Sequence, residues 1–132
     1  MTAFLLDTSA LVDYSKRRKP AYSQILAWVD GNDTLAVCAI SVAEFYSGLS
    51  PSEASDCQEV ITSLDYWPIS PDVAMLAGQD RYRFTRRGIA IPVTDSLLAA
   101  LARKRNAVLV TGNLKDFPLQ DITIFHLDGT RS

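Results

Sequence analysis

The stretch AFLLDTSALVDY, residues 3–14, decides the fold class of this 132-residue chain. Its first four residues are apolar and predict a short buried β-strand. Asp7 follows directly, and DTSALVDY then predicts the first turns of a helix, because Asp is a favoured residue just before a helix. A strand that passes straight into a helix is typical of an α/β protein. Here it leaves a carboxylate where the strand ends.

The same alternation continues along the chain. Further buried strands are predicted at LAVCAI (35–40), WPIS (67–70) and AVLVT (107–111), with TIFHL (123–127) as a candidate fifth strand. Helices are predicted between them, at residues 22–31, 41–48, 51–66, 70–87 and 95–106. Strands joined through helices form right-handed crossovers and parallel sheets. We therefore expect residues 1–132 to be a single three-layer, Rossmann-like α/β domain, with a mostly parallel sheet of four to five strands flanked by helices.

Composition excludes several classes of protein. Hydrophobic residues make up 48% of the chain, which is enough for a sizeable core. No apolar run approaches the ~18 residues of a membrane span, and the N-terminus lacks a signal-peptide pattern. We expect a soluble, cytoplasmic protein without membrane contact. Two distant cysteines and one histidine cannot assemble a Cys/His zinc site, and both cysteines are expected to be reduced core residues.

The net charge of −2 hides a strong segregation of charge. Residues 20–80 contain nine acids and no Lys or Arg, whereas the bases cluster at residues 16–19 and 81–105. A basic stripe on a nearly neutral protein indicates a path for a polyanion, although solvated helix faces explain it equally well. The candidate phosphate contacts are Arg17, Arg18, Arg81, Arg83, Arg86 and Arg87.

Four acids are placed to converge at one edge of the predicted sheet. Asp7 ends the first strand, Glu44 lies in the helix after the second, Asp95 begins the helix before AVLVT, and Asp116 follows that strand together with Asn113. In parallel sheets, sites form beyond the carboxyl ends of the strands. Two carboxylates ~5 Å apart repel by ~3 kcal/mol at an effective dielectric of ~20, so protons or a cation must relieve the cluster. Hard oxygen ligands favour Mg²⁺ or Mn²⁺, and a phosphodiester is the natural substrate.

Each acid also has a purely structural explanation. Asp7 can cap the helix that follows it. Glu44 stands three residues after Ser41, which is the spacing of a capping box. Asp95 can complement a helix dipole, and Asp116 can be a turn residue. The case for chemistry therefore rests on their joint placement.

The order of motifs resembles a known family. LLDTSAL (5–11), SVAEFYSG (41–48), TDSLLAALA (94–102) and LVTGNLKDF (109–117) follow one another as in the PIN-domain family, specifically the VapC toxins of VapBC toxin–antitoxin pairs. The resemblance covers nearly the whole chain and implies a PIN-like fold. It also implies a metal-dependent endoribonuclease, in which the metal binds a phosphate oxygen and lowers the pKa of a coordinated water that attacks phosphorus.

The resemblance assigns roles to residues. Asp7 and Asp95 match the principal metal ligands, Asp116 a further ligand or supporting group, and Glu44 a ligand through water or a base; these four are the candidate catalytic residues. Ser9, Thr111 and Asn113 are the candidate supporting residues, which hold waters and carboxylates in place. Many PIN domains have an aspartate where this chain has Asn113, so one Mg²⁺ or Mn²⁺ is expected rather than two. The implied partners are RNA, a VapB-type antitoxin and a second copy of the chain.

Two other functions stay open. Because Asn113 brings no charge, the chain can also be a non-catalytic PIN-like module that binds RNA or protein. A phospho-accepting receiver domain likewise gathers carboxylates at the end of a parallel sheet, but it needs an aspartate after the third strand. Here WPIS ends in Ser70 and is followed by Pro71, so this reading lacks its central residue.

Overall fold

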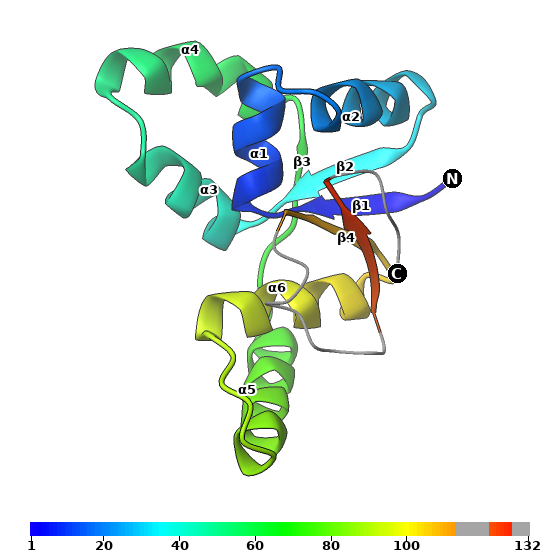
Figure 1. The fold of residues 1–132 in the computed structure, drawn as a ribbon, viewed down its shortest axis with the longest axis vertical. Helices are drawn as coiled ribbons and strands as arrows, with labels where there is room; N and C mark the ends of the chain where they lie inside the picture. Colours follow the sequence, from blue (N-terminus) through cyan, green and yellow to red (C-terminus); the bar gives the residue numbers. More distant parts are fainter. Residues whose placement is uncertain (113–121, 128–132) are drawn as a thin grey trace.

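The structure, a computed structural model, describes residues 1–112 and 122–127 of the chain (Figure 1). Each of the first three strands is followed by a pair of helices. In chain order the elements are β1 Ala3–Leu6, α1 Thr8–Ser15, α2 Ala21–Asp30, β2 Thr34–Val37, α3 Ala39–Ser47, α4 Pro51–Thr62, β3 Asp65–Tyr66, α5 Pro71–Arg86, α6 Val93–Lys104, β4 Val108–Thr111 and β5 Thr123–His126.

The strands form one five-stranded sheet in the order β3-β2-β1-β4-β5. Every pairing between neighbours is parallel. β1 therefore lies at the centre, with β2 on one side and β4 on the other. Chain order reverses between β1 and β4, and in open α/β sheets this is where a crevice forms beyond the carboxyl ends of the strands. Asp7 and Gly112, the residue directly after β4, lie at that point.

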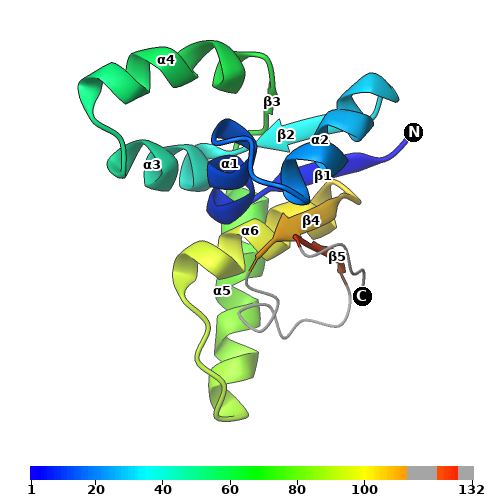
Figure 2. The same ribbon diagram turned by 45° about the horizontal axis from the view of Figure 1, so that its top comes forward.

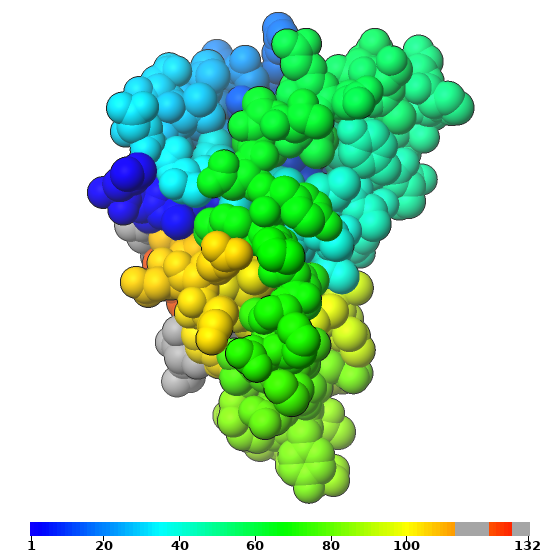
Figure 3. All heavy atoms as spheres, turned by 180° about the vertical axis from the view of Figure 1, so that it is seen from behind, coloured from blue at the N-terminus to red at the C-terminus, as the bar shows by residue number. Residues whose placement is uncertain are grey.

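The sheet is apolar on both faces because it is covered on both faces. Successive side chains of a strand point to opposite sides, so Phe4 and Leu6 join one core while Leu5 joins the other. The first core is completed by α1, α2 and α3, and the second by α5 and α6 (Figure 2). Seen from behind, α5 runs along the surface beside α6 (Figure 3). The predicted three-layer α/β fold and the fifth strand are confirmed, and the sheet is entirely parallel.

Two of the predicted strands have wrong bounds, and so do the helices next to them. The second strand ends at Val37, and α3 already begins at Ala39, because Cys38 is extended and its backbone N–H donates to the Ser41 hydroxyl at 3.4 Å. The run LAVCAI is thus half strand and half helix, since apolarity alone does not distinguish the two.

The third strand is Asp65–Tyr66, not WPIS, and α4 ends earlier than expected, at Thr62. The Trp67 side chain is buried, although its residue lies just past the strand. It is anchored by its backbone N–H, which donates to the Val37 carbonyl at 2.8 Å. None of the helices in the described ranges is long and apolar enough to cross a membrane.

Candidate active site

Asp7 occupies the junction between β1 and α1. Its backbone N–H donates to the Val110 carbonyl of β4 at 3.1 Å, so the junction is tied to the neighbouring strand. Its carboxylate caps α1 by accepting from the Ala10 N–H at 2.9 Å, and the Ser9 hydroxyl donates to the same Oδ1 at 2.7 Å. The capping role considered from the sequence is therefore real. Asp7 is nevertheless only 5% exposed, whereas a cap does not require burial.

Burial raises the pKa of Asp7 above its ordinary value. Hydrogen bonds from the Thr111 and Ser9 side chains and from the Ala10 backbone act in the opposite direction but do not cancel the desolvation. The ionised carboxylate is thus held where water stabilises it poorly. A cation next to Asp7 would supply the missing stabilisation, and its oxygen atoms are of the type that Mg²⁺ and Mn²⁺ prefer.

Ser9 joins the ends of β1 and β4. Its hydroxyl donates to Asp7 and accepts from the Gly112 backbone N–H at 2.9 Å. Thr111, fully buried, ends β4 and also bonds the Asp7 carboxylate. Ser9 and Thr111 were both predicted as supporting residues, and the structure places both on Asp7.

Gly112 is a site residue that sequence reasoning missed. A Cβ at this position would lie 3.3 Å from the Ser9 hydroxyl oxygen and 3.3 Å from the Leu127 Cδ1. Glycine permits the close approach that the Ser9 contact needs. The signal was present in the sequence, since a glycine directly after a buried strand often marks such an approach.

Glu44 lies on α3, which packs against α1. The Thr8 hydroxyl donates to Glu44 Oε1 at 2.9 Å, so Glu44 is linked to the residue next to Asp7. The capping-box explanation of Glu44 is wrong, because α3 begins before Ser41 and Ser41 itself bonds the N-cap backbone. Glu44 is exposed and stands in the second turn, where it does not cap the helix.

Asp95 stands in the first turn of α6 and is half-buried. The position suits an acid, because the N-terminus of a helix carries partial positive charge. α6 packs against both α3 and β4, the elements that carry Glu44 and Thr111. Asn113 and Asp116 lie outside the described residues. Within the described ranges, no three Asp, Glu, His or Cys side chains are grouped closely enough to hold a metal ion.

The candidate phosphate-binding arginines of α5 are engaged within the protein. Arg83 pairs with the buried Asp80, and Arg81 Nε donates to the Ile91 carbonyl at 2.8 Å. The guanidinium groups of Arg86 and Arg87 lie over the rings of Tyr82 and Phe84, at 4.2 and 5.2 Å. The C-terminal turn of α5 also points away from the sheet (Figure 1).

The two basic residues between α1 and α2 are placed differently. Arg17 is exposed, with a backbone φ of 54°, and Arg18 lies 3.6 Å from Asp13. An exposed ion pair of this length contributes little, so Arg18 can exchange its partner for a phosphate. The loop that carries both residues follows α1, whose other end holds Asp7.

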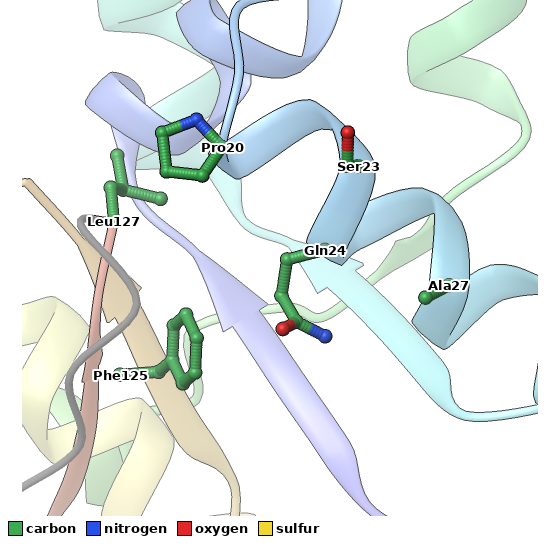
Figure 4. A pocket seen from close by; sticks show the side chains of 6 residues that line it. All are labelled: Pro20, Ser23, Gln24, Ala27, Phe125 and Leu127. Atoms are coloured by element: carbon green, nitrogen blue, oxygen red, sulfur yellow. The ribbon is translucent and has the colours of Figure 1, made fainter.

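A separate cavity of about 310 Å³ lies between α2 and β5. Its lining consists of Pro20, Ser23, Gln24, Ala27, Phe125 and Leu127 (Figure 4). No residue predicted for the site lines it. One of its lining residues, Leu127, also approaches Gly112.

Comparisons with known proteins bear on this arrangement. The family model described as PIN domain matches residues 4–119, a range that includes all four predicted acids. A Ribonuclease VapC2 of Haemophilus influenzae is 31% identical over 126 residues, covering 89% of this chain and 91% of the relative. A Ribonuclease VapC2 of Rickettsia felis is 28% identical over 119 residues, covering 86% and 89%. The crystal structure of VapBC2 from Rickettsia felis bound to a DNA fragment from their promoter matches with a TM-score of 0.81 and 25% identity, covering 93% of this chain and 97% of that one.

Proposed function

This chain belongs to the PIN-domain family and to its VapC ribonucleases, and from that premise we propose that it is the endoribonuclease toxin of a type II toxin–antitoxin pair. The observation that carries the proposal is the buried Asp7 carboxylate at the reversal point of the sheet. A buried charge is costly unless it is paired, and a divalent cation with a bound phosphate is a suitable partner.

The four acids divide the work unequally. Asp7 and Asp95 are the principal ligands for Mg²⁺ or Mn²⁺, and Asp116 is a further ligand or supporting group. Glu44, oriented by the Thr8 hydroxyl, holds or deprotonates the attacking water. When bound, the cation would polarise the phosphate and lower the pKa of a water molecule. Because position 113 is an amide, the residues favour a single cation.

The supporting residues keep Asp7 in one orientation. Ser9 and Ala10 both bond its Oδ1, and Thr111 adds a third contact from the neighbouring strand. Such outer contacts fix the direction in which a carboxylate presents its oxygens. They also offset part of the rise in the pKa of Asp7 that burial causes.

RNA and a protein partner complete the proposal. Arg17 and Arg18 are the better candidates for binding phosphate, because Arg17 is exposed and Arg18 has only a surface ion pair with Asp13 to exchange. The other candidates have closer partners within the chain; they are Arg81, Arg83, Arg86 and Arg87. A VapB-type antitoxin would block the site. The similarity of this chain to one solved in a VapBC complex supports this part of the proposal. We further propose that the toxin is a homodimer.

Two observations test the proposal together. Induction of the chain alone should arrest growth, and co-expression of a small reading frame from just upstream of its gene should relieve the arrest. Purified protein should cut RNA with Mg²⁺ or Mn²⁺ and stop when EDTA is added. Asp95→Asn should abolish both effects, whereas Asp56→Asn, a matched change at an exposed acid of α4, should abolish neither. RNA binding without cleavage would favour the non-catalytic module instead.

A further inference from the structure

The only histidine of the chain lies beside the proposed site but outside the predicted carboxylate set. His126 ends β5, the edge strand next to β4, and pairs with Thr111 in the sheet. Its neighbours Phe125 and Leu127 face the cavity beside α2 (Figure 4). The imidazole Nε2 of His126 lies 3.2 Å from the Gly112 carbonyl oxygen. A carbonyl only accepts, so Nε2 carries the proton of this hydrogen bond.

Gly112 connects this histidine to Asp7. The Gly112 N–H donates to the Ser9 hydroxyl at 2.9 Å, and that hydroxyl donates to Asp7 Oδ1 at 2.7 Å. The path therefore runs from His126 through the Gly112 backbone and Ser9 to the carboxylate. Each step is a hydrogen bond between described residues or the backbone of Gly112 itself.

Gly112 is the residue of this path whose backbone is easiest to reorient. A side-chain carbon at position 112 would crowd both Ser9 and Leu127, which would each have to move by a few tenths of an ångström. Glycine, however, has the greatest backbone freedom of any residue. Its N–H and C=O can rotate independently unless each is held. Ser9 holds the N–H, and His126 holds the C=O.

We propose that His126 is a positioning residue of the metal site. Its Nε2–H fixes the Gly112 carbonyl, and this keeps the Gly112 N–H on Ser9 and the Asp7 carboxylate in its metal-binding orientation. The inference rests on the proposed function, because it gives His126 no role unless Asp7 binds a cation.

The experiment compares two substitutions of His126 that introduce the same amide group on side chains of different length. In His126→Gln the side-chain amide nitrogen takes the place of Nε2, whereas in His126→Asn the amide is too short to reach Gly112. The readouts are Mn²⁺ affinity by electron paramagnetic resonance and the Mn²⁺ concentration that gives half-maximal RNA cleavage. Loss of a supporting contact to a metal ligand typically costs about 10- to 100-fold. We expect His126→Asn to weaken Mn²⁺ binding about 10-fold and His126→Gln to stay within about 3-fold of wild type.

Two further variants separate positioning from general structure. Thr123→Ala changes an exposed residue of the same strand and should leave Mn²⁺ affinity unchanged. Ser9→Ala should weaken Mn²⁺ binding, and adding His126→Asn to Ser9→Ala should weaken it no further, because both residues act along one path.

Each outcome has a distinct meaning. Equal Mn²⁺ affinities of wild type and His126→Asn, or additive effects of the Ser9 and His126 changes, would overturn the positioning role while leaving the ribonuclease intact. A wild-type protein that neither binds Mn²⁺ nor cuts RNA would overturn the proposed function, and this inference with it. If His126→Asn fails to fold, the Ser9→Ala single variant and the binding of Mn²⁺ by His126→Gln still decide the question: loss of binding by His126→Gln would contradict the proposal.

Discussion

Replacing Asp80 should destabilise the protein more than replacing any other buried polar residue of α5 or α6. The Asp80 side chain is 0% exposed and lies between two guanidinium groups, Arg83 of its own helix and Arg103 of α6. The contact to Arg103 Nη2 measures 2.7 Å, and that side chain is only 20% exposed. The carboxylate therefore joins two helices through a charge-assisted hydrogen bond that is largely shielded from water.

The magnitude follows from burial. Removing one partner of a buried ion pair costs about 3–5 kcal/mol, because the remaining charge loses its compensation. An unfolding entropy of about 2.1 cal/mol/K per residue gives a 132-residue chain about 0.28 kcal/mol/K. Asp80→Ala should therefore lower Tm by about 11–18 °C. Arg83→Ala removes a side chain that is 61% exposed, and it should cost no more than about 1 kcal/mol, or about 4 °C.

The assay is thermal unfolding followed by circular dichroism, on wild type, Asp80→Ala and Arg83→Ala at neutral pH and the same protein concentration. The comparison between the two variants matters more than either Tm alone. Both variants remove the Arg83–Asp80 ion pair, but only Asp80→Ala removes the buried carboxylate. If Arg83→Ala destabilised the protein as much as Asp80→Ala, burial would not be the source of the effect, and the reasoning would be refuted.

The remaining predictions concern Asp7 and Gly112. Burial raises the pKa of Asp7, so its ionised form weakens the fold above that pKa, and the penalty fades as pH falls toward 3.8. In EDTA at pH 7, Asp7→Asn, which keeps the cap, should melt higher than wild type, with a gap that closes on acidification; a lower Tm at pH 7 would contradict this. At about 100 times its dissociation constant, Mn²⁺ should stabilise wild type by about 2.7 kcal/mol, or about 10 °C, and Asp7→Asn hardly at all. Gly112→Ala should slow RNA cleavage about 10-fold or more by crowding Ser9, whereas Gly78→Ala, at a position with nothing within 4 Å, should not.

Much of the fold was predictable because its signals are local. AFLL before Asp7, Ser70 with Pro71 before α5, and the apolar run of β4 each specify an element without help from distant residues. The alternation of these elements is enough to predict parallel pairing and two covered faces. The same logic predicted that Asp7 and the end of β4 would meet. The supporting roles of Ser9 and Thr111 were expected from the family resemblance instead.

The remainder depends on contacts between distant parts of the chain. The early start of α3 depends on a bond between Cys38 and Ser41, and the short β3 on its pairing with β2. Neither feature changes the spacing of apolar residues along the chain, so that spacing could not predict them. His126 read as an ordinary strand residue, because its partner, the Gly112 carbonyl, is a backbone atom that no motif identifies. Asp80 was invisible for a similar reason, since its partner Arg103 is on another helix.

Single-turnover cleavage of RNA by purified wild type and Asp7→Asn, at saturating Mg²⁺, tests the role of the buried carboxylate most directly. Asn keeps the helix cap and the shape of the side chain but removes the charge that holds the cation. The variant should fold, as circular dichroism will verify, and should cut at least about 100-fold more slowly than wild type. Cleavage at the wild-type rate by folded Asp7→Asn would contradict the assignment of Asp7 as the centre of the active site.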